Sequence, residues 1–489
     1  MLFHSFRFLF FFPCVFFLYF ALPFRFRKYL LLIASYYFYM CWRPEFIVLI
    51  LLSTAVDYFC SLGIGKYRTN SRAAKGFLAL SLTVNLGLLF LFKYFNFFGE
   101  TLTALCRAIS IPFSAPALDI VLPVGISFYT FQTLSYTIDV YRGKLEPERD
   151  FITFALFVSF FPQLVAGPIE KASNLLPQLK EERPFSYDNA TWGLKLMAWG
   201  FFKKLVIADR LAALLVDPVF ENPTGYSGGA FLIAAAAFAI QIYCDFGGYS
   251  DIARGCAKTM GVDLMVNFKA PYFATSITDF WRRWHISLTS WFREYVYIPL
   301  GGNRKGPWKK ALFITVTFFL SGLWHGAGWT FIIWGLLQAL YLNTETLFLH
   351  SCTNAPPPHT SGLRSWCKGL LSRLVTFALC CFSWIFFRAS SMGDALYILR
   401  HSITGGKTPV QYVKNALRTL YPGTVLTAVL LLSLALLLLF DWANESGDAI
   451  EKLSARPIYI RWPVYIVFLL LLLLLIPKES TAPFIYFQF

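Results

Sequence analysis

The stretch Ser321–Trp329, with the sequence SGLWHGAGW, places a histidine inside a long apolar run. Between Ala311 and Leu342 the chain has no Asp, Glu, Lys or Arg, which is typical of a membrane-embedded segment. An ionisable side chain is costly at that depth, so such a residue is by default a candidate functional group. His325 is therefore the first candidate. The alternative is a core histidine that hydrogen-bonds a neighbouring carbonyl.

The depth of His325 follows from the basic residues that precede it. If Lys309 and Lys310 mark a membrane surface, His325 lies roughly 22 Å further along a helix that rises ~1.5 Å per residue. That is past the middle of a hydrocarbon core about 30 Å thick. Small neighbours should let another backbone or a ligand approach closely. They are Gly322, Gly326, Ala327 and Gly328.

The composition of the whole chain is that of a polytopic membrane protein. Of its 489 residues, 57% are hydrophobic and 14% are charged, whereas a soluble domain carries about 25% charged residues. No polar segment is long enough to fold alone, so we expect a single integral domain over residues 1–489. The net charge of +16 arises from short Lys and Arg clusters between apolar runs. This pattern indicates the positive-inside rule rather than nucleic-acid binding. A cationic entrance for an anionic cofactor is the alternative.

Motifs for metal and nucleotide binding are absent from the sequence. The 10 cysteines form no C-x-x-C pair, and neither H-x-x-x-H nor H-E-x-x-H occurs. We therefore predict no metal site. A Walker A motif and a G-x-G-x-x-G motif are also missing, so nucleotide hydrolysis has no support.

The basic clusters predict how the chain is oriented. Arg25–Lys28, Lys66–Lys75 and Arg304–Lys310 are expected to face the cytoplasm, which places the amino terminus outside. The segment Gly99–Asp119 is expected to be an external loop. About eleven crossings are predicted in all. The clearest apolar runs are Leu2–Pro23, Tyr29–Trp42, Glu45–Ile64, Gly76–Phe98, Ile120–Val140, Leu370–Phe387, Val425–Trp442 and Val464–Ile476.

Four stretches are expected to depart from simple spans. Phe151–Pro168 holds Pro162 and should break or re-enter. Trp192–Leu215 mixes apolar and charged residues and should form an amphipathic helix at the interface or along a wet funnel. Cys244–Asp251 should be irregular backbone in a cavity wall. Ser351–Lys368 is polar and should be a flexible loop.

Residues 276–295 are expected to form one amphipathic helix along the membrane interface. At 100° per residue, Trp281, Trp284 and His285 share an apolar sector about 120° wide. Arg282 and Arg283 lie on the polar side. These two arginines can hold a phosphate or anchor the helix at lipid headgroups, and the sequence does not decide between the two.

The two candidate histidines can act together if this helix tucks under the bundle, because both would then face one channel. A neutral imidazole with a pKa near 6.5 can take a proton from a hydroxyl at neutral pH. Asp245 and Asp251 are either an acid–base pair or structural residues that satisfy backbone N–H groups or orient an imidazole.

Several stretches resemble the membrane-bound O-acyltransferase family. They include LPVGISFYTFQ at Leu122–Gln132, QLVAGPI at Gln163–Ile169, WGFFKKL at Trp199–Leu205, DFWRRWHISL at Asp279–Leu288 and YIPLGGNR at Tyr297–Arg304. The resemblance covers essentially the whole chain, with a core motif region at 120–345. It is closer to the bacterial polysaccharide acetylation branch than to the teichoic-acid D-alanylation branch. One departure is Gly247, where related sequences usually have serine.

The resemblance implies an all-α multipass fold, a ring of helices around a tunnel that links a cytoplasmic donor to an external acceptor. His325 would be the essential histidine and His285 its partner. Supporting residues would be Asp245, Asp251, Trp324 and Tyr249. The donor would contact Arg282, Arg283, Asn303, Arg304 and Lys305.

The same resemblance implies an O-acetyltransferase of a bacterial inner membrane. It would hold no bound cofactor and would take acetyl-CoA or another acyl thioester as donor. An SGNH-hydrolase-like partner would complete transfer to an exported polysaccharide, and membrane lipids would surround the chain. The alternatives are D-alanyl transfer to teichoic acid, O-acetylation of peptidoglycan, and a proton-coupled transporter or flippase.

Overall fold

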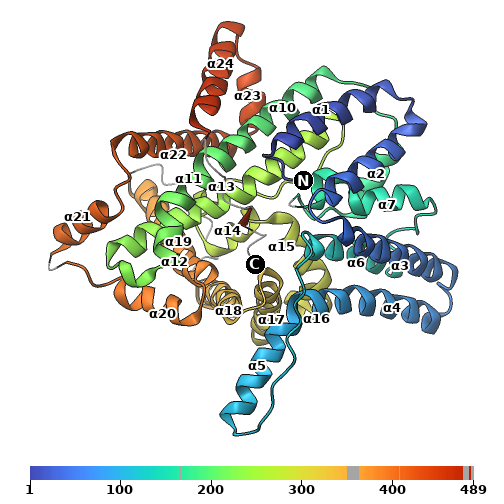
Figure 1. Ribbon diagram of the computed structural model, residues 1–489, viewed down its shortest axis with the longest axis horizontal. Helices are drawn as coiled ribbons and strands as arrows, with labels where there is room; N and C mark the ends of the chain where they lie inside the picture. The colour runs from blue at the N-terminus through green and yellow to red at the C-terminus, as the bar shows by residue number, and fades with distance from the viewer. Residues whose placement is uncertain (166, 350–362, 407, 477–483, 486–489) are drawn as a thin grey trace. The chain divides into compact units, whose positions relative to one another are not determined.

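A computed structural model describes residues 1–165, 167–349, 363–406, 408–476 and 484–485 (Figure 1). Within these ranges the regular structure is helical, and no strand occurs. The all-α prediction is therefore confirmed. Helices suit a chain in hydrocarbon because they satisfy their backbone N–H and C=O groups within the segment.

The chain divides into two compact units, which are described separately. The first contains Met1–Met197 and Ser250–Met265. Its helices are α1 (Phe6–Ala21), α2 (Phe24–Met40), α3 (Ile47–Lys66), α4 (Ser71–Leu89), α5 (Phe95–Ala108), α6 (Ile126–Tyr141), α7 (Phe151–Ser159), α8 (Phe161–Leu164), α9 (Ala172–Lys180) and most of α10 (Tyr187–Phe201), with the short η1 (Pro44–Phe46) and η2 (Phe90–Tyr94).

The second unit contains Ala198–Tyr249 and Val266–Phe489. Helix α13 (Gly229–Thr259) contributes to it up to Tyr249. The longer helices are α17 (Pro307–His325), α18 (Trp329–Thr344), α19 (Leu363–Arg388), α20 (Met392–His401), α21 (Pro409–Thr419), α22 (Thr424–Glu445) and α24 (Ile458–Leu475). The shorter ones are η3 (Phe202–Ala208), α11 (Asp209–Leu211), η4 (Ala212–Val216), α12 (Asp217–Glu221), η5 (Pro223–Gly225), η6 (Pro271–Phe273), α14 (Ile277–Arg283), α15 (Ile286–Phe292), η7 (Arg293–Tyr297), α16 (Ile298–Leu300), η8 (Gly302–Lys305), η9 (Glu345–Leu349) and α23 (Ala449–Ser454).

Six helical segments of the described chain are long and apolar enough to cross a membrane. They are Pro44–Lys66, Ser71–Ala108, Gly229–Thr259, Trp366–Arg388, Thr424–Glu445 and Ile458–Leu475, and the shorter Phe6–Ala21 is also apolar. Helix α24 exposes leucines such as Leu473 and Leu474, as expected of a surface that contacts lipid. The multipass prediction is confirmed, while the number of eleven crossings stays a prediction.

A buried polar network joins three helices of the first unit, α3, α4 and α6, which lie side by side (Figure 1). Asp57 accepts hydrogen bonds from Ser81, from Asn85 Nδ2 at 2.9 Å and from Thr137 Oγ1 at 3.1 Å. Ser53 Oγ donates in turn to Asn85 Oδ1 at 2.5 Å. Polar contacts of this kind hold helices together where lipid gives no hydrophobic driving force.

Helices α17 and α18 pack against each other at unusually close range, and glycine makes this possible. A Cβ placed on Gly322 would lie 2.4 Å from the carbonyl oxygen of Phe331. One placed on Gly335 would lie 2.3 Å from the carbonyl oxygen of Phe318. The predicted close backbone approach beside His325 is therefore confirmed.

The prediction of irregular backbone at Cys244–Asp251 is wrong, because these residues are helical within α13. Other contacts explain why polar and small residues occur there. Asp245 is neutralised by Lys204 at 2.8 Å. Gly248 sits against the carbonyl oxygen of Gly200, 2.7 Å from where a Cβ would be. Both features are compatible with a helix that packs tightly.

The prediction of one continuous helix over residues 276–295 is also wrong. Helix α14 is capped by Ser276, whose Oγ accepts the N–H of Asp279, and it ends at Arg283. Trp284 is extended and His285 is left-handed, with φ 40°. Helix α15 then begins at Ile286. Backbone hydrogen bonds from a neighbouring segment impose this break, which side-chain periodicity does not reveal.

Four further expectations have different outcomes. The expected break in Phe151–Pro168 is confirmed, since α7 ends at Ser159 and α8 begins at Phe161. The loop expected from Gly99 is wrong in its first part, because α5 runs to Ala108. The interface alternative for 192–215 is wrong for 202–209, which is buried, with Lys204 and Asp209 paired inside the protein. The funnel alternative stays a prediction. The predicted loop 351–368 lies outside the described residues up to 362, and its remainder starts α19.

Candidate functional site

His325 is the last residue of α17. The chain leaves the helix through Gly326, which is extended, and enters α18 at Trp329.

His285 occupies the break between α14 and α15 in a strained conformation, with φ 40° and ψ 56°. The left-handed region costs a non-glycine residue about 1–2 kcal/mol. Three hydrogen bonds fix the chain there. The N–H of Ile286 donates to the Asn267 carbonyl at 2.9 Å, the N–H of Lys269 donates to the Arg283 carbonyl at 3.0 Å, and Ser287 Oγ donates to Asn267 Oδ1 at 2.6 Å. Strain that the surroundings enforce is characteristic of functional positions.

The structure brings the two histidines together. Their ring centroids lie 6.5 Å apart. His285 is 0% exposed and His325 is 3% exposed. Trp324 contacts both imidazoles, with centroid distances of 6.0 Å to His285 and 5.0 Å to His325. The sequence-based expectation that the two rings share one site agrees with this geometry.

Aromatic rings form much of the surroundings of the pair. The ring of His325 meets Trp334 edge-on at 4.9 Å and Phe387 at 5.3 Å. The ring of His285 meets Phe246 edge-on at 4.6 Å. Such surroundings exclude water and lower the local dielectric constant, so any charge formed there is felt strongly.

Burial also fixes the protonation state of His285, which lies outside the six candidate spans. It lowers the pKa of the His285 imidazole to about 3, because the charged form is poorly solvated. His285 is therefore neutral at physiological pH and can accept or donate a hydrogen bond, but it does not carry a resting charge.

Asp245 belongs to a buried charged cluster with Lys204 and Asp209. The Lys204 Nζ lies 2.8 Å from Oδ1 of each carboxylate. Burial opposes the charge on Lys204, but the two carboxylates hold its pKa above the usual value. Burial raises the pKa of Asp209 to about 7 despite its cationic partner. Tyr249 is next to this cluster, with the Lys204 Nζ 5.8 Å from its ring centroid.

Asp251 belongs to the first unit, whereas Asp245 and both histidines belong to the second. Its Oδ1 is 3.5 Å from Arg254 NH1, one helical turn away on α13. Asp245 pairs with Lys204 and Asp251 pairs with Arg254, so the roles suggested for the two aspartates stay predictions.

The predicted donor-binding residues fall into two groups. Arg283 is engaged by Asp279 at 2.9 Å and by Glu445, so its charge fixes α14. Asn303 accepts a hydrogen bond from Tyr297 at 2.5 Å. The side chains of Arg282, Arg304 and Lys305 are exposed. These three are available to an anionic ligand.

A G-x-S-x-G match at Gly225–Gly229 (GYSGG) escaped the sequence analysis. A nucleophilic serine of that motif requires a strand before the turn and a helix after it. Here the 3-10 turn η5 precedes it, Ser227 is exposed, and the N–H of Gly228 donates to the His401 carbonyl at 2.9 Å. The match is a turn that leads into α13.

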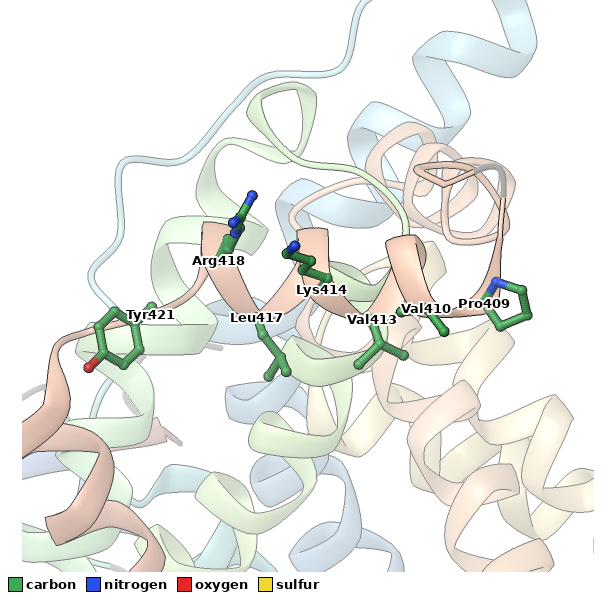
Figure 2. Close-up of a pocket in the computed structure, with 7 residues that line it drawn as sticks. All are labelled: Pro409, Val410, Val413, Lys414, Leu417, Arg418 and Tyr421. Atoms are coloured by element: carbon green, nitrogen blue, oxygen red, sulfur yellow. The ribbon is translucent and has the colours of Figure 1, made fainter.

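A surface groove along α21 is unrelated to the histidines (Figure 2). Figure 2 shows Val413 and Leu417 projecting from one side of this helix, and Lys414 and Arg418 from another. The lining has no histidine or carboxylate. It consists of Pro409, Val410, Val413, Lys414, Leu417, Arg418 and Tyr421. Within the described chain, no group of three or more His, Cys, Asp or Glu side chains is placed to hold a metal ion.

Some residues around the site were missed by sequence reasoning. Phe246, Asn267, Trp334 and Phe387 are ordinary core residue types, and nothing in their spacing marks them. Lys204 gave a signal, because a lysine in the apolar context of WGFFKKL needs a buried partner. That signal calls for a carboxylate, and the structure supplies two, Asp209 and Asp245.

Comparison of the sequence with known proteins identifies the family of the chain. The family model described as MBOAT, membrane-bound O-acyltransferase family, matches residues 148–387. A "Probable alginate O-acetylase" of Pseudomonas putida is 37% identical over 483 residues, which is 95% of each chain. That of Pseudomonas aeruginosa is 41% identical over 413 residues, 84% of this chain and 76% of the relative. A "Peptidoglycan O-acetyltransferase" of Helicobacter pylori is 35% identical over 402 residues, 77% of this chain and 73% of the relative.

The chain belongs to the membrane-bound O-acyltransferase family, and it is an O-acyltransferase enzyme. The resemblance inferred from the motifs is confirmed.

Proposed function

We propose that this chain transfers an acetyl group from cytoplasmic acetyl-CoA to hydroxyls of an exported polysaccharide, as part of alginate-type O-acetylation in a bacterial inner membrane. The observation that carries the proposal is the buried pair His285 and His325, 6.5 Å apart. The relatives named for alginate and peptidoglycan O-acetylation support both the acetyl group and a polymeric acceptor.

In the proposed reaction, His325 acts as general base. It takes the proton from the acceptor hydroxyl while the hydroxyl oxygen attacks the thioester carbonyl. The new C–O bond forms, the C–S bond breaks, and the thiolate of coenzyme A leaves with the electron pair. The imidazolium then gives its proton to the thiolate, so charge and protons balance. A positioned general base contributes about 10²–10⁴-fold to such a rate.

His285 serves in this scheme as the neutral partner. Its fixed left-handed backbone and its edge contact with Phe246 hold the ring in one orientation. A neutral imidazole can hydrogen-bond the acceptor or the thioester without charge repulsion against the imidazolium of His325. Trp324 lies against both rings and keeps their spacing.

The donor is expected to enter from the cytoplasmic side. Coenzyme A is an anion, and Arg282, Arg304 and Lys305 offer exposed cations on the same unit as the histidines. In this orientation the loops at Arg25–Lys28 and Lys66–Lys75 are cytoplasmic as well, and the amino terminus is external.

The acceptor side requires a further component, because an exported polymer lies outside the membrane. We propose that the acceptor hydroxyl in the step above belongs to an SGNH-hydrolase-like partner, which then passes the acetyl group to a hydroxyl of the polysaccharide. A tunnel beside the histidines would join the two sides in this scheme. The second candidate function, D-alanyl transfer, uses the same histidine chemistry but a carrier protein as donor.

Inside-out membrane vesicles test the proposal, because their cytoplasmic face is accessible. Vesicles that contain the chain and its partner are given acetyl-CoA labelled in the acetyl group. We expect label in polymer or partner and release of one free coenzyme A thiol per acetyl group transferred. A parallel sample is given a carrier protein that bears labelled D-alanine. Label transfer in that sample alone would favour D-alanylation. Solute flux without thioester cleavage would contradict the acyltransferase and favour a transporter.

A further inference from the structure

The charged cluster of Lys204, Asp209 and Asp245 takes no part in the acyl-transfer steps proposed above. Its side chains are 1%, 4% and 3% exposed. Removing three charges from water is costly unless each finds several good partners. One lysine faces two carboxylates here, so the carboxylate oxygens that it does not reach need other donors.

One of those donors comes from the far end of the chain. The backbone N–H of Ile485 donates to Asp245 Oδ2 at 2.9 Å, across 240 positions of sequence. Phe484 and Ile485 are 0% and 1% exposed. The charged cluster therefore binds a short, fully buried piece of the carboxyl-terminal segment.

This piece is connected to the histidine pair through aromatic contacts. The ring of Phe484 lies 4.2 Å from that of Tyr249 and 6.0 Å from that of Phe246. Phe246 in turn meets His285 edge-on at 4.6 Å. The contacts therefore form one continuous path from Ile485 to the imidazole of His285.

The spacing on α13 explains how a single helix makes both connections. Asp245 and Tyr249 are one turn apart and share a face, while Phe246 is rotated by about 100° towards His285. Gly248 lets this helix approach the Gly200 carbonyl, 2.7 Å from the position of a Cβ. That close approach brings Lys204 within reach of Asp245.

We propose that Lys204, Asp209 and Asp245 are positioning residues that capture Phe484–Ile485 and so hold Phe246 against His285. Only the predicted effect of these residues on the rate of acetyl transfer rests on the proposed function. The capture itself is a structural property and can be measured separately.

The capture is tested with a single reporter cysteine. Ile485→Cys is made in a background that lacks the 10 native cysteines, and an impermeant maleimide is applied in mild detergent. The thiol is expected to react slowly, because position 485 is buried. Adding Lys204→Met, which leaves Asp245 without its cation, is expected to raise the labelling rate at least tenfold. Equal rates with and without Lys204→Met would overturn the capture, whatever reaction the protein performs.

The effect on the reaction is tested by removing one hydrogen-bond donor. Ile485→Pro deletes the N–H that Asp245 accepts, whereas Ile485→Ala keeps it and removes more side chain. We expect kcat of the proline variant to fall on the order of 10²-fold, as for a misplaced catalytic group. We expect the alanine variant to retain at least ten times the kcat of the proline variant.

A positioning role also predicts which parameters stay constant. The KM for acetyl-CoA and the amount of folded protein in the membrane should be similar in the two Ile485 variants. Equal kcat values in both variants would overturn the positioning role. If the wild type transfers no acetyl group while the maleimide result holds, the proposed function fails and the capture stands.

Discussion

The ring of His325 lies 6.5 Å from that of His285, although the two residues end and begin different helices. Helix α17 delivers His325 at its carboxyl end, and a strained break between α14 and α15 delivers His285. Both rings are buried among aromatic side chains. The chemistry that we propose depends on this arrangement, and the following predictions test its parts.

The left-handed backbone of His285 should make the position selective for residues that tolerate φ 40°. Asparagine adopts this region readily, whereas a β-branched residue does not. His285→Val should therefore be less stable than His285→Asn by about 1–2 kcal/mol. Thermal unfolding of the two purified variants in the same detergent measures the difference. Equal stability would show that the strain is absent.

The lowered pKa of His285 predicts a pH dependence of stability. The unfolded imidazole titrates near its ordinary value of about 6.5, and the folded one titrates at about 3. Between these values the unfolded chain binds the extra proton, so this group's contribution to stability is present above pH 6.5 and is lost as the pH falls.

We therefore expect the wild type to lose stability relative to His285→Gln as the pH is lowered from 7 to 5. The comparison of two variants is needed because Asp209, whose pKa is raised to about 7, acts with the opposite sign in both. A stability difference between the wild type and His285→Gln that stays constant from pH 7 to pH 5 would contradict the buried neutral imidazole.

The close packing of α17 on α18 predicts opposite outcomes for two neighbouring glycines. Gly322→Ala would place a Cβ 2.4 Å from the Phe331 carbonyl oxygen and force the helices apart. Overpacking of this kind costs about 1–3 kcal/mol and should displace His325. Gly328→Ala meets its nearest atom at 3.5 Å, an ordinary contact.

Membrane abundance and acetylation per molecule should thus fall in the Gly322 variant and stay near the wild-type level in the Gly328 variant. If both alanines are tolerated alike, the close approach of the two helices is not required for the site.

The exposed cations should act in donor binding. Replacing Arg304 and Lys305 with glutamine removes two charges that anionic coenzyme A can use, so the KM for acetyl-CoA should rise several-fold while kcat changes little. The double variant Lys309→Gln, Lys310→Gln removes the same charge from the start of α17 and serves as a matched control. Equal effects in both double variants would indicate general membrane anchoring instead.

The sequence predicted the membrane class and the all-α fold, which are confirmed, and it singled out His285 and His325, whose roles stay predictions. Long apolar runs, and a histidine within one of them, can be recognised in the sequence without any knowledge of the tertiary contacts. The glycines beside His325 predicted the close approach of another backbone or of a ligand, and at Gly322 the structure shows the backbone of α18.

The remaining features depend on contacts between distant segments. The break at His285 arises from hydrogen bonds with Asn267 and Lys269, which no helical periodicity records. Likewise, Asp245 suggested an irregular wall, whereas Lys204 neutralises it inside a regular helix. The charges of residues 192–215 suggested an interface or a wet funnel, whereas Lys204 and Asp209 pair inside the protein.

The central claim is that His325 is the general base, and its most direct test is polymer-bound acetyl ester in cells that express His325→Gln. Glutamine keeps the volume and hydrogen bonding of the buried site but cannot accept a proton near neutral pH. With the signal normalised to protein in the membrane, we predict a loss of about 10²–10⁴-fold at normal abundance. His325→Ala should lose as much. Substantial acetylation by the glutamine variant would contradict the account and remove His325 from the mechanism.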